Sequence, residues 1–249
     1  MIHKIITHNG IFHADDVMSV ALLHECISSE IPIERKRNIS FDEFTNPNVW
    51  LVDVGGQYDA LFNNFDHHQD STLPAACMIV LLELRNKDII SEDMKDELFG
   101  NIHSISHIDC NGPLNMEGFQ FNTLIKSFNT LDNGWDLALS VCRAYIQSCK
   151  STVAKIAESR DIWDSGEKIS LYIRSCQAFP IHWKRYEEQP FLVYPHDGKY
   201  NLISSNSDHF PLMSTGRESF MHANRFLAVF DNKEDATICA QRSTYNAIG

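Results

Sequence analysis

Four short stretches that combine aspartate or histidine with glycine or asparagine most constrain what this chain can fold into. Each lies where an apolar run stops, and their sequences are THNGIFHADD at 7–16, VDVGG at 52–56, FDHHQ at 65–69 and ISHIDCNG at 105–112. In an α/β sheet, polar residues that follow the strands gather at one edge, where such folds bind their substrates. The pattern therefore predicts an α/β domain with one polar site built from distant parts of the sequence.

The segment Asp66-His67-His68 carries the densest metal-binding chemistry of the four. A carboxylate oxygen beside imidazole nitrogens suits manganese, iron or zinc better than calcium. In an extended segment Asp66 and His68 share one face and His67 takes the other, so one residue can hold a metal while its neighbour meets a substrate. A polar turn with two solvated histidines is the alternative. The other three stretches favour the metal, because together they supply the residue types of a two-metal hydrolase site.

Composition restricts the class of protein. With 249 residues and 43% hydrophobic residues the chain can bury a core, and its net charge of −12 argues against a protein that coats long duplex nucleic acid. A short strand or a nucleotide held by metals stays possible. The seven cysteines are odd in number and form no C-x-x-C pair, which indicates reduced thiols, most of them buried, in a cytoplasmic protein. No signal peptide and no membrane-spanning run are apparent, so no membrane partner is expected.

Apolar patterning predicts the order of the elements. Strands are expected at 3–7, 31–37 and 49–53, with a helix beginning near Val17 between the first two. This rhythm predicts a parallel sheet with right-handed crossovers. Asp15 and Asp16 stand at the start of the first helix, where capping alone is the alternative to a metal role. Further helices are predicted at 74–85, 91–108, 115–128 and 135–159.

The pattern changes after about residue 162. Strands are predicted at 191–194 and 199–204, as a hairpin around an Asp197-Gly198 turn, and at 225–230. A closing helix is predicted at 233–243. We therefore divide the chain into a first domain at 1–160, which contains the Asp/His stretches, and a smaller second domain at 161–249. In the second domain, Trp183 with Lys184 and Arg185 either stacks on and pairs with a nucleotide or is a packed tryptophan beside two solvated cations.

The forms T-H-N-G-x-F-H-x-D-D, D-V-G-G-x-Y-D and F-D-H-H-Q, in this order, resemble the DHH phosphoesterase superfamily. Within it they resemble the melanocyte-proliferating-gene family of metal-dependent exonucleases. The resemblance covers most of the first 112 residues. It implies a DHH-type α/β domain, with a mainly parallel sheet flanked by helices, followed by a smaller α/β substrate domain.

The resemblance also implies a site with two divalent metal ions, manganese first and magnesium as the alternative. The first metal takes His8, His13 and Asp53, and the second takes Asp15, Asp53, His67 and Asp109, with Asp53 bridging. His68 would contact the phosphate or assist the leaving oxygen, and Asp66 would orient His67 or His68. The implied activity is hydrolysis of single-stranded RNA or DNA as a 3'-5' exonuclease. The alternatives are hydrolysis of a small phosphoester, such as a nucleotide, short oligonucleotide or pyrophosphate, and binding without turnover.

Two departures from the family pattern affect the site. The first concerns the metal ligand Asp109, and the second concerns the residues expected to contact the substrate. In 105–112 an acid is replaced by Ser106 and one residue is inserted before Asn111, so Asp109 is the carboxylate left there. Near the C-terminus two glycines and a histidine that follow the position of His222 in the family are absent. Arg217, Arg225 and His222 are therefore expected to hold more of the phosphate charge. The oligomeric state is left open, with a homodimer as one option.

Overall fold

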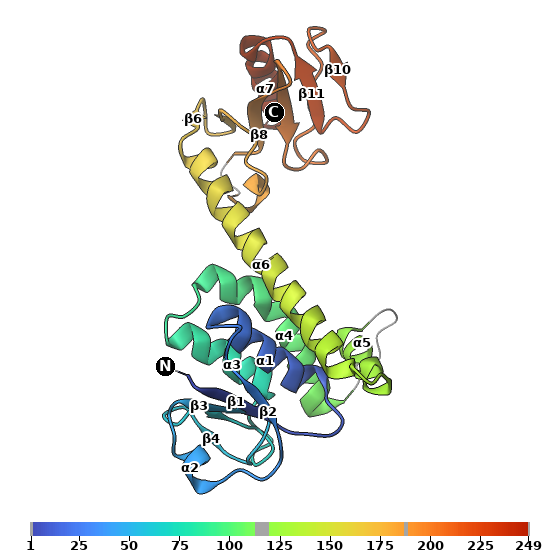
Figure 1. The fold of residues 1–249 in the computed structure, drawn as a ribbon. Helices are drawn as coiled ribbons and strands as arrows, with labels where there is room; N and C mark the ends of the chain where they lie inside the picture. Colours follow the sequence, from blue (N-terminus) through green and yellow to red (C-terminus); the bar gives the residue numbers. More distant parts are fainter. Residues whose placement is uncertain (1, 113–119, 187–188, 249) are drawn as a thin grey trace. The chain divides into compact units, whose positions relative to one another are not determined.

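The computed structural model describes residues 2–112, 120–186 and 189–248, and the chain forms two compact units, Met1–Val153 and Ala154–Gly249 (Figure 1). The boundary falls inside the long helix α6 (Gly134–Asp164), some residues before the division at 160. A continuous helix contains no turn residues, so its sequence does not mark where one unit ends.

The first unit is built on a five-stranded sheet in the order β2-β1-β3-β5-β4. Its strands are β1 (Lys4–Thr7), β2 (Ile33–Arg35), β3 (Val49–Val52), β4 (Tyr58–Asp59) and β5 (Asn64–Phe65). All neighbours are parallel except β4, which runs antiparallel to β5. All four residues of β3 are buried, as expected for a strand inside a parallel sheet covered by helices. The predicted α/β fold with a mainly parallel sheet is confirmed.

Helix α1 (Ala14–Cys26) is buried on nearly every side, because it packs against both the sheet and helix α3 (Ala76–Asn86). Polar residues in its first turn are therefore forced into the interior, and Asp15 and Asp16 are both 0% exposed. The other helices of this unit are α2 (Phe41–Phe44), α4 (Glu92–Asn111), α5 (Phe121–Ser127), the 3₁₀ turn η1 (Phe128–Thr130) and the first part of α6.

Two predicted helices differ from the observed ones. Helix α4 begins after its N-cap Ser91 and continues to Asn111, beyond the predicted end at 108, so Asp109 lies in a helical turn and not in a loop after the helix. The helix predicted at 115–128 corresponds to α5 and η1, and residues 115–119 lie outside the described residues. Gly112, with φ +84, follows α4 directly and ends it.

The second unit contains a six-stranded sheet in the order β10-β11-β9-β8-β7-β6, with helix α7 (Lys233–Ile248) packed on it. The strands are β6 (Glu167–Lys168), β7 (Ile173–Ser175), β8 (Phe191–His196), β9 (Lys199–Ser204), β10 (Phe220–Met221) and β11 (Leu227–Phe230), and the 3₁₀ turn η2 is Trp183–Tyr186. Asp197 and Gly198, with φ +50 and +75, form the predicted β8–β9 turn. Strand β11 begins two residues later than predicted, because Arg225 has φ +55 and belongs to a turn.

This unit is the smaller α/β domain that the sequence predicts. Within the described residues, no helix of either unit combines the length and the apolar character needed to cross a membrane.

Candidate metal centre

Neighbouring parallel strands bring the Asp/His stretches to one edge of the first sheet. His8 follows β1, Asp53 follows β3 and Asp66 follows β5, and these three strands are adjacent. Asp15 reaches the same place from the first turn of α1, and Asp109 from the last turn of α4. The structure therefore brings residues from five separate elements into one cluster.

Asp53 stands between two groups of candidate ligands. Its Oδ2 lies 3.4 Å from Nε2 of His8, and its Oδ1 lies 3.5 Å from Nε2 of His67. His13 joins His8 and Asp53, with one ligand atom from each residue within 4.8 Å of the others. Asp53 has φ +53, a conformation that aspartate and asparagine adopt more readily than most residues. This backbone turn is part of how the carboxylate, 4% exposed, comes to face both histidines.

The second group surrounds His67. Its Nε2 lies 3.3 Å from Oδ2 of Asp109 and 3.7 Å from Oδ2 of Asp15. Asp15 is held in place by helix α3, because its carboxylate accepts hydrogen bonds from the backbone amides of Ala76 (3.0 Å) and Cys77 (2.7 Å). Asp15 lies in the first turn of α1, yet the helix that its carboxylate caps is α3.

Asp66 organises the turn that carries the histidines. One carboxylate oxygen, Oδ1, accepts from Nδ1 of His68 at 2.7 Å and from the backbone amide of His67 at 2.8 Å, while Oδ2 accepts from the amide of Gly56 at 2.6 Å. Of the two histidines, it is the ring of His68 that Asp66 orients. Because a carboxylate only accepts hydrogen bonds, Nδ1 of His68 carries the proton. The ring is 64% exposed, so Nε2 is the atom that can meet a substrate.

The residues of the cluster fit divalent cations. Three buried polar atoms, Asp53 Oδ1, His67 Nε2 and Asp16 Oδ2, have no hydrogen-bond partner among the described residues. Unpaired buried polar atoms are costly, and a cation bound by Asp53 and His67 would satisfy the atoms of these two residues. A donor set of carboxylates and imidazoles suits a borderline transition metal such as manganese, iron or zinc.

Without a metal, protons on the histidines offset the carboxylate charges. The hydrogen bond with Asp53 raises the pKa of His8 to about 9, against the effect of burial. Burial by itself lowers the pKa of His67, but hydrogen bonds with Asp109 and Asp53 outweigh this effect and raise the pKa to about 11. Burial, with the charges of Asp53 and Asp109, raises the pKa of Asp15 well above its ordinary value. The cluster is thus short of positive charge, which a cation supplies.

Asp16 and Cys110 belong to this environment as well. The sequence leaves Asp16 between a capping and a metal role, and it carries no signal for Cys110. Asp16 does cap α1, by accepting from the amide of His13 at 2.7 Å, but its other oxygen lies 3.2 Å from Nε2 of His8. Burial raises its pKa to about 7. Cys110 is exposed, with Sγ 3.9 Å from Nδ1 of His67. A capping pattern and a lone thiol are too common to identify a site by themselves.

The loop that carries His8 and His13 is held by two distant side chains. Arg35 donates to the carbonyls of His8 (3.3 Å) and Gly10 (3.0 Å). Asn129 pairs with the backbone of Phe12 at both ends, accepting from its amide at 3.0 Å and donating to its carbonyl at 2.8 Å. These contacts hold the loop of the candidate ligands His8 and His13, which we call the ligand loop, against β2 and η1.

Replacing Asn129 with alanine should therefore loosen the ligand loop. Loss of two partly buried hydrogen bonds is expected to lower the free energy of unfolding by about 1–3 kcal/mol and to weaken metal binding. Chemical denaturation and a manganese titration measure the two effects. Asn86→Ala, at the exposed end of α3, is the matched control. Unchanged manganese affinity in Asn129→Ala would show that the loop keeps its shape without this pairing.

The residues predicted to contact substrate lie in the second unit. His222 and Arg225 form the turn between β10 and β11, where the amide of Arg225 donates to the carbonyl of His222 at 2.8 Å. Arg217 forms an ion pair with Asp235, with Nη1 2.7 Å from Oδ1. A phosphate at Arg217 would have to compete with that carboxylate.

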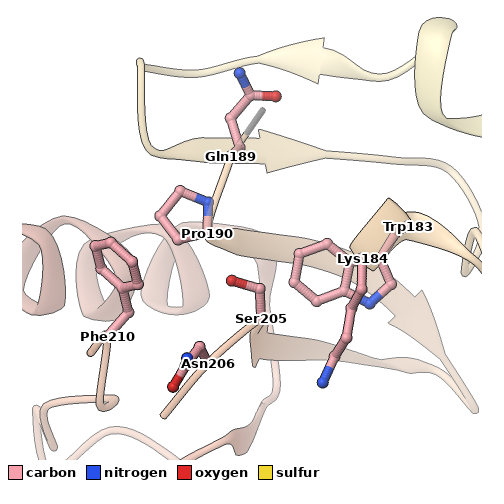
Figure 2. A pocket seen from close by; sticks show the side chains of 7 residues that line it. All are labelled: Trp183, Lys184, Gln189, Pro190, Ser205, Asn206 and Phe210. Carbon is pink, nitrogen blue, oxygen red and sulfur yellow. The ribbon is translucent and has the colours of Figure 1, made fainter. Parts of the chain in front are cut away.

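The second unit also contains a cavity of about 310 Å³, which Figure 2 shows from close by. It is lined by Trp183, Lys184, Gln189, Pro190, Ser205, Asn206 and Phe210. Trp183 is only 3% exposed and stacks on Trp163, with 6.1 Å between ring centroids. Of the two alternatives for Trp183, the structure shows the packed one, with Lys184 at the cavity beside it.

Comparison with known proteins agrees with the motifs of the first unit. Residues 4–81 match the model of the family MYG1_exonuc, described as an uncharacterised protein family (UPF0160). The first unit is a relative of the MYG1 proteins. Over 133 residues the chain is 32% identical to a MYG1 protein of Chlamydia trachomatis, a match that covers 51% of this chain and 45% of that protein.

Two further comparisons differ in extent. A MYG1 exonuclease of Homo sapiens is 37% identical over 68 residues, covering 27% of this chain and 18% of the human protein. The matched region thus spans less than half the length of either relative. Among solved structures, the pGpG-specific phosphodiesterase PggH from Vibrio cholerae covers 99% of this chain and is itself covered in full, at 11% identity and a TM-score of 0.33. At that TM-score the likeness carries no weight in the assignment.

Proposed function

We propose that the first unit is the catalytic centre of a metal-dependent phosphodiesterase. The observation that carries this proposal is the position of Asp53, whose two oxygens lie 3.4 Å from His8 and 3.5 Å from His67. One carboxylate shared between two groups of nitrogen and oxygen donors is the arrangement that two-metal hydrolases require. The name exonuclease, given to the human relative, is consistent with this chemistry.

The candidate residues would have the following roles. His8, His13 and Asp53 would hold one cation, and Asp15, Asp53, His67 and Asp109 would hold the other. When bound, such cations supply an activated water and neutralise phosphoryl oxygens. His68, with Nδ1–H fixed on Asp66 at 2.7 Å, would present Nε2 to the phosphate or to the leaving oxygen. When both ring nitrogens carry a proton, Nε2–H would give its proton to the leaving oxygen, and the neutral ring would keep Nδ1–H on Asp66.

Manganese is the cation we propose, because two or more imidazole ligands are unusual for magnesium, which prefers oxygen. As substrate we propose single-stranded RNA or DNA, cleaved from the 3' end. A net charge of −12 favours the second candidate, a small phosphoester such as a short oligonucleotide, because the chain has little positive charge with which to follow a long strand. We further propose that the second unit contacts the substrate through His222, Arg217 and Arg225.

Hydrolysis assays with and without manganese test the proposal. We expect release of mononucleotides from a labelled single strand, at a rate that depends on added manganese and falls with a chelator. The panel contains the same strand labelled at either end, a duplex, a dinucleotide, pyrophosphate and bis(p-nitrophenyl) phosphate. Turnover of the small phosphoesters alone would select the second candidate. Manganese binding with no turnover of any member would reject the catalytic proposal.

A further inference from the structure

A cleft of about 360 Å³ opens beside the metal centre of the first unit. Its wall includes His13 and Asp109, which are candidate ligands of different metals. The other lining residues are Ala14, Ile108, Gln120, Asn122, Thr123 and Lys126. A substrate whose phosphate lies on the metals would therefore have part of its remaining structure in this cleft. Its volume is in the range of ordinary ligand pockets.

Helix α5 turns a polar face toward the cleft. Asn122 and Thr123 lie four and three residues before Lys126, a spacing that places both on the same side of the helix as Lys126. On its other side Ile125 is 0% exposed and packs in the core together with Phe121. The orientation of α5 is thus set by its apolar residues, and the polar face follows from it.

The wall that α5 provides is rigid where it meets the metal centre. Asn129, in the 3₁₀ turn directly after α5, pairs with both backbone groups of Phe12, the residue before His13. Asn122 donates from Nδ2 to the carbonyl of Ile105 in α4 at 3.5 Å. The polar face and the ligand loop are therefore held in one arrangement.

The chemistry of the lining indicates what the cleft binds. Lys126 is an exposed cation, and among the described residues no carboxylate forms an ion pair with it. Asn122 and Thr123 add neutral groups that can bond to hydroxyls or phosphate oxygens. None of the described lining residues is Phe, Tyr or Trp, and the one ring among them, the imidazole of His13, is a candidate metal ligand. This combination fits a sugar and a phosphate better than a nucleobase.

We propose that Lys126 binds a second phosphate of the substrate, next to the one that lies on the metals, with Asn122 and Thr123 contacting the sugar between them. This inference rests on the proposed phosphodiesterase function and narrows its substrate class. The centre then prefers a phosphodiester that carries a further phosphate, such as a 5'-phosphorylated dinucleotide or the end of a longer strand, over one that carries a single phosphate. In a chain with a net charge of −12, this local cation offsets repulsion of a second anionic group.

Equilibrium binding tests the inference separately from catalysis. The probes are two non-hydrolysable methylphosphonate dinucleotides, with and without a 5'-phosphate, titrated in the presence of manganese. We expect the wild-type chain to bind the 5'-phosphorylated probe roughly fivefold more tightly, the scale of one solvent-exposed charge pair. Lys126→Met keeps the aliphatic stem and removes the charge. It should abolish this preference and leave the affinity for the unphosphorylated probe unchanged.

Lys87→Met is the matched control, because Lys87 is an exposed lysine of the same unit that pairs with Glu83 and does not line the cleft. It should keep the preference. An equal affinity of the wild-type chain for both probes, or a preference retained in Lys126→Met, would overturn the inference. Absence of turnover in the manganese assays would instead reject the phosphodiesterase proposal, so the two failures are distinguishable.

Discussion

Asp53→Asn is expected to lower the rate of manganese-dependent hydrolysis by about a thousandfold or more, the scale of several kcal/mol of metal catalysis. The side-chain amide has one oxygen where the carboxylate has two. It can therefore no longer offer an oxygen ligand to both the group around His8 and the group around His67. Asparagine also tolerates the φ of +53 at this position, so the backbone should keep its course. Steady-state kinetics on one substrate, beside a metal analysis, measures the effect.

The folded state serves as the internal check on this variant. Thermal unfolding of metal-free Asp53→Asn should remain cooperative, which separates a lost ligand from a lost fold. Asp132→Asn, at an exposed position of the same unit, is the matched control and should leave both rate and metal content unchanged. Full activity of Asp53→Asn with unaltered manganese content would contradict a bridging role for this carboxylate.

Metal binding is expected to release at least two protons at neutral pH, because histidine binds a metal only in its neutral form. The buried carboxyl of Asp15, whose pKa is raised, adds to this release when it loses its proton to bind metal. The pKa of His8 is raised to about 9 and that of His67 to about 11, so both rings are protonated in the metal-free protein at pH 7.5. Raising the pH through about 9 removes the proton that competes at His8, and manganese affinity should increase over that range. Calorimetric titration in two buffers with different ionisation enthalpies counts the protons.

The same pKa shifts predict how the metal-free protein responds to pH. A raised histidine pKa stabilises the folded state fully below about pH 6.5, the unfolded value, and this contribution is lost as the pH rises through the folded value. For His8 the loss occurs between about 6.5 and 9. Unfolding temperatures of the metal-free chain should therefore fall across that interval. His8→Gln is the control for the proton count, and it should release one proton fewer than the wild-type chain when manganese binds. Manganese binding to the wild-type chain without proton release would contradict the protonated state of both rings.

The sequence alone determined where three of the five strands of the first sheet lie, and which residues follow β1 and β3. The two-residue strands β4 and β5 are not predicted, because two residues are too few to show a pattern. Buried parallel strands need unbroken apolar runs, so β1 and β3 are visible in the sequence, and Asp53 is marked as a strand-end residue. The β8–β9 hairpin is visible for a similar local reason, because Asp197-Gly198 favours a tight turn. Motifs of this kind depend on neighbouring residues only.

Tertiary structure decided the parts of the site that depend on packing between distant segments. Asp16 faces His8 because α1 is buried on nearly all sides. Asp109 reaches His67 from the last turn of a helix, where the sequence predicted a loop. Lys126 borders the cleft because Ile125 anchors the opposite face of α5 in the core. Each placement follows from which apolar face a helix buries, and that choice is made by the neighbouring elements.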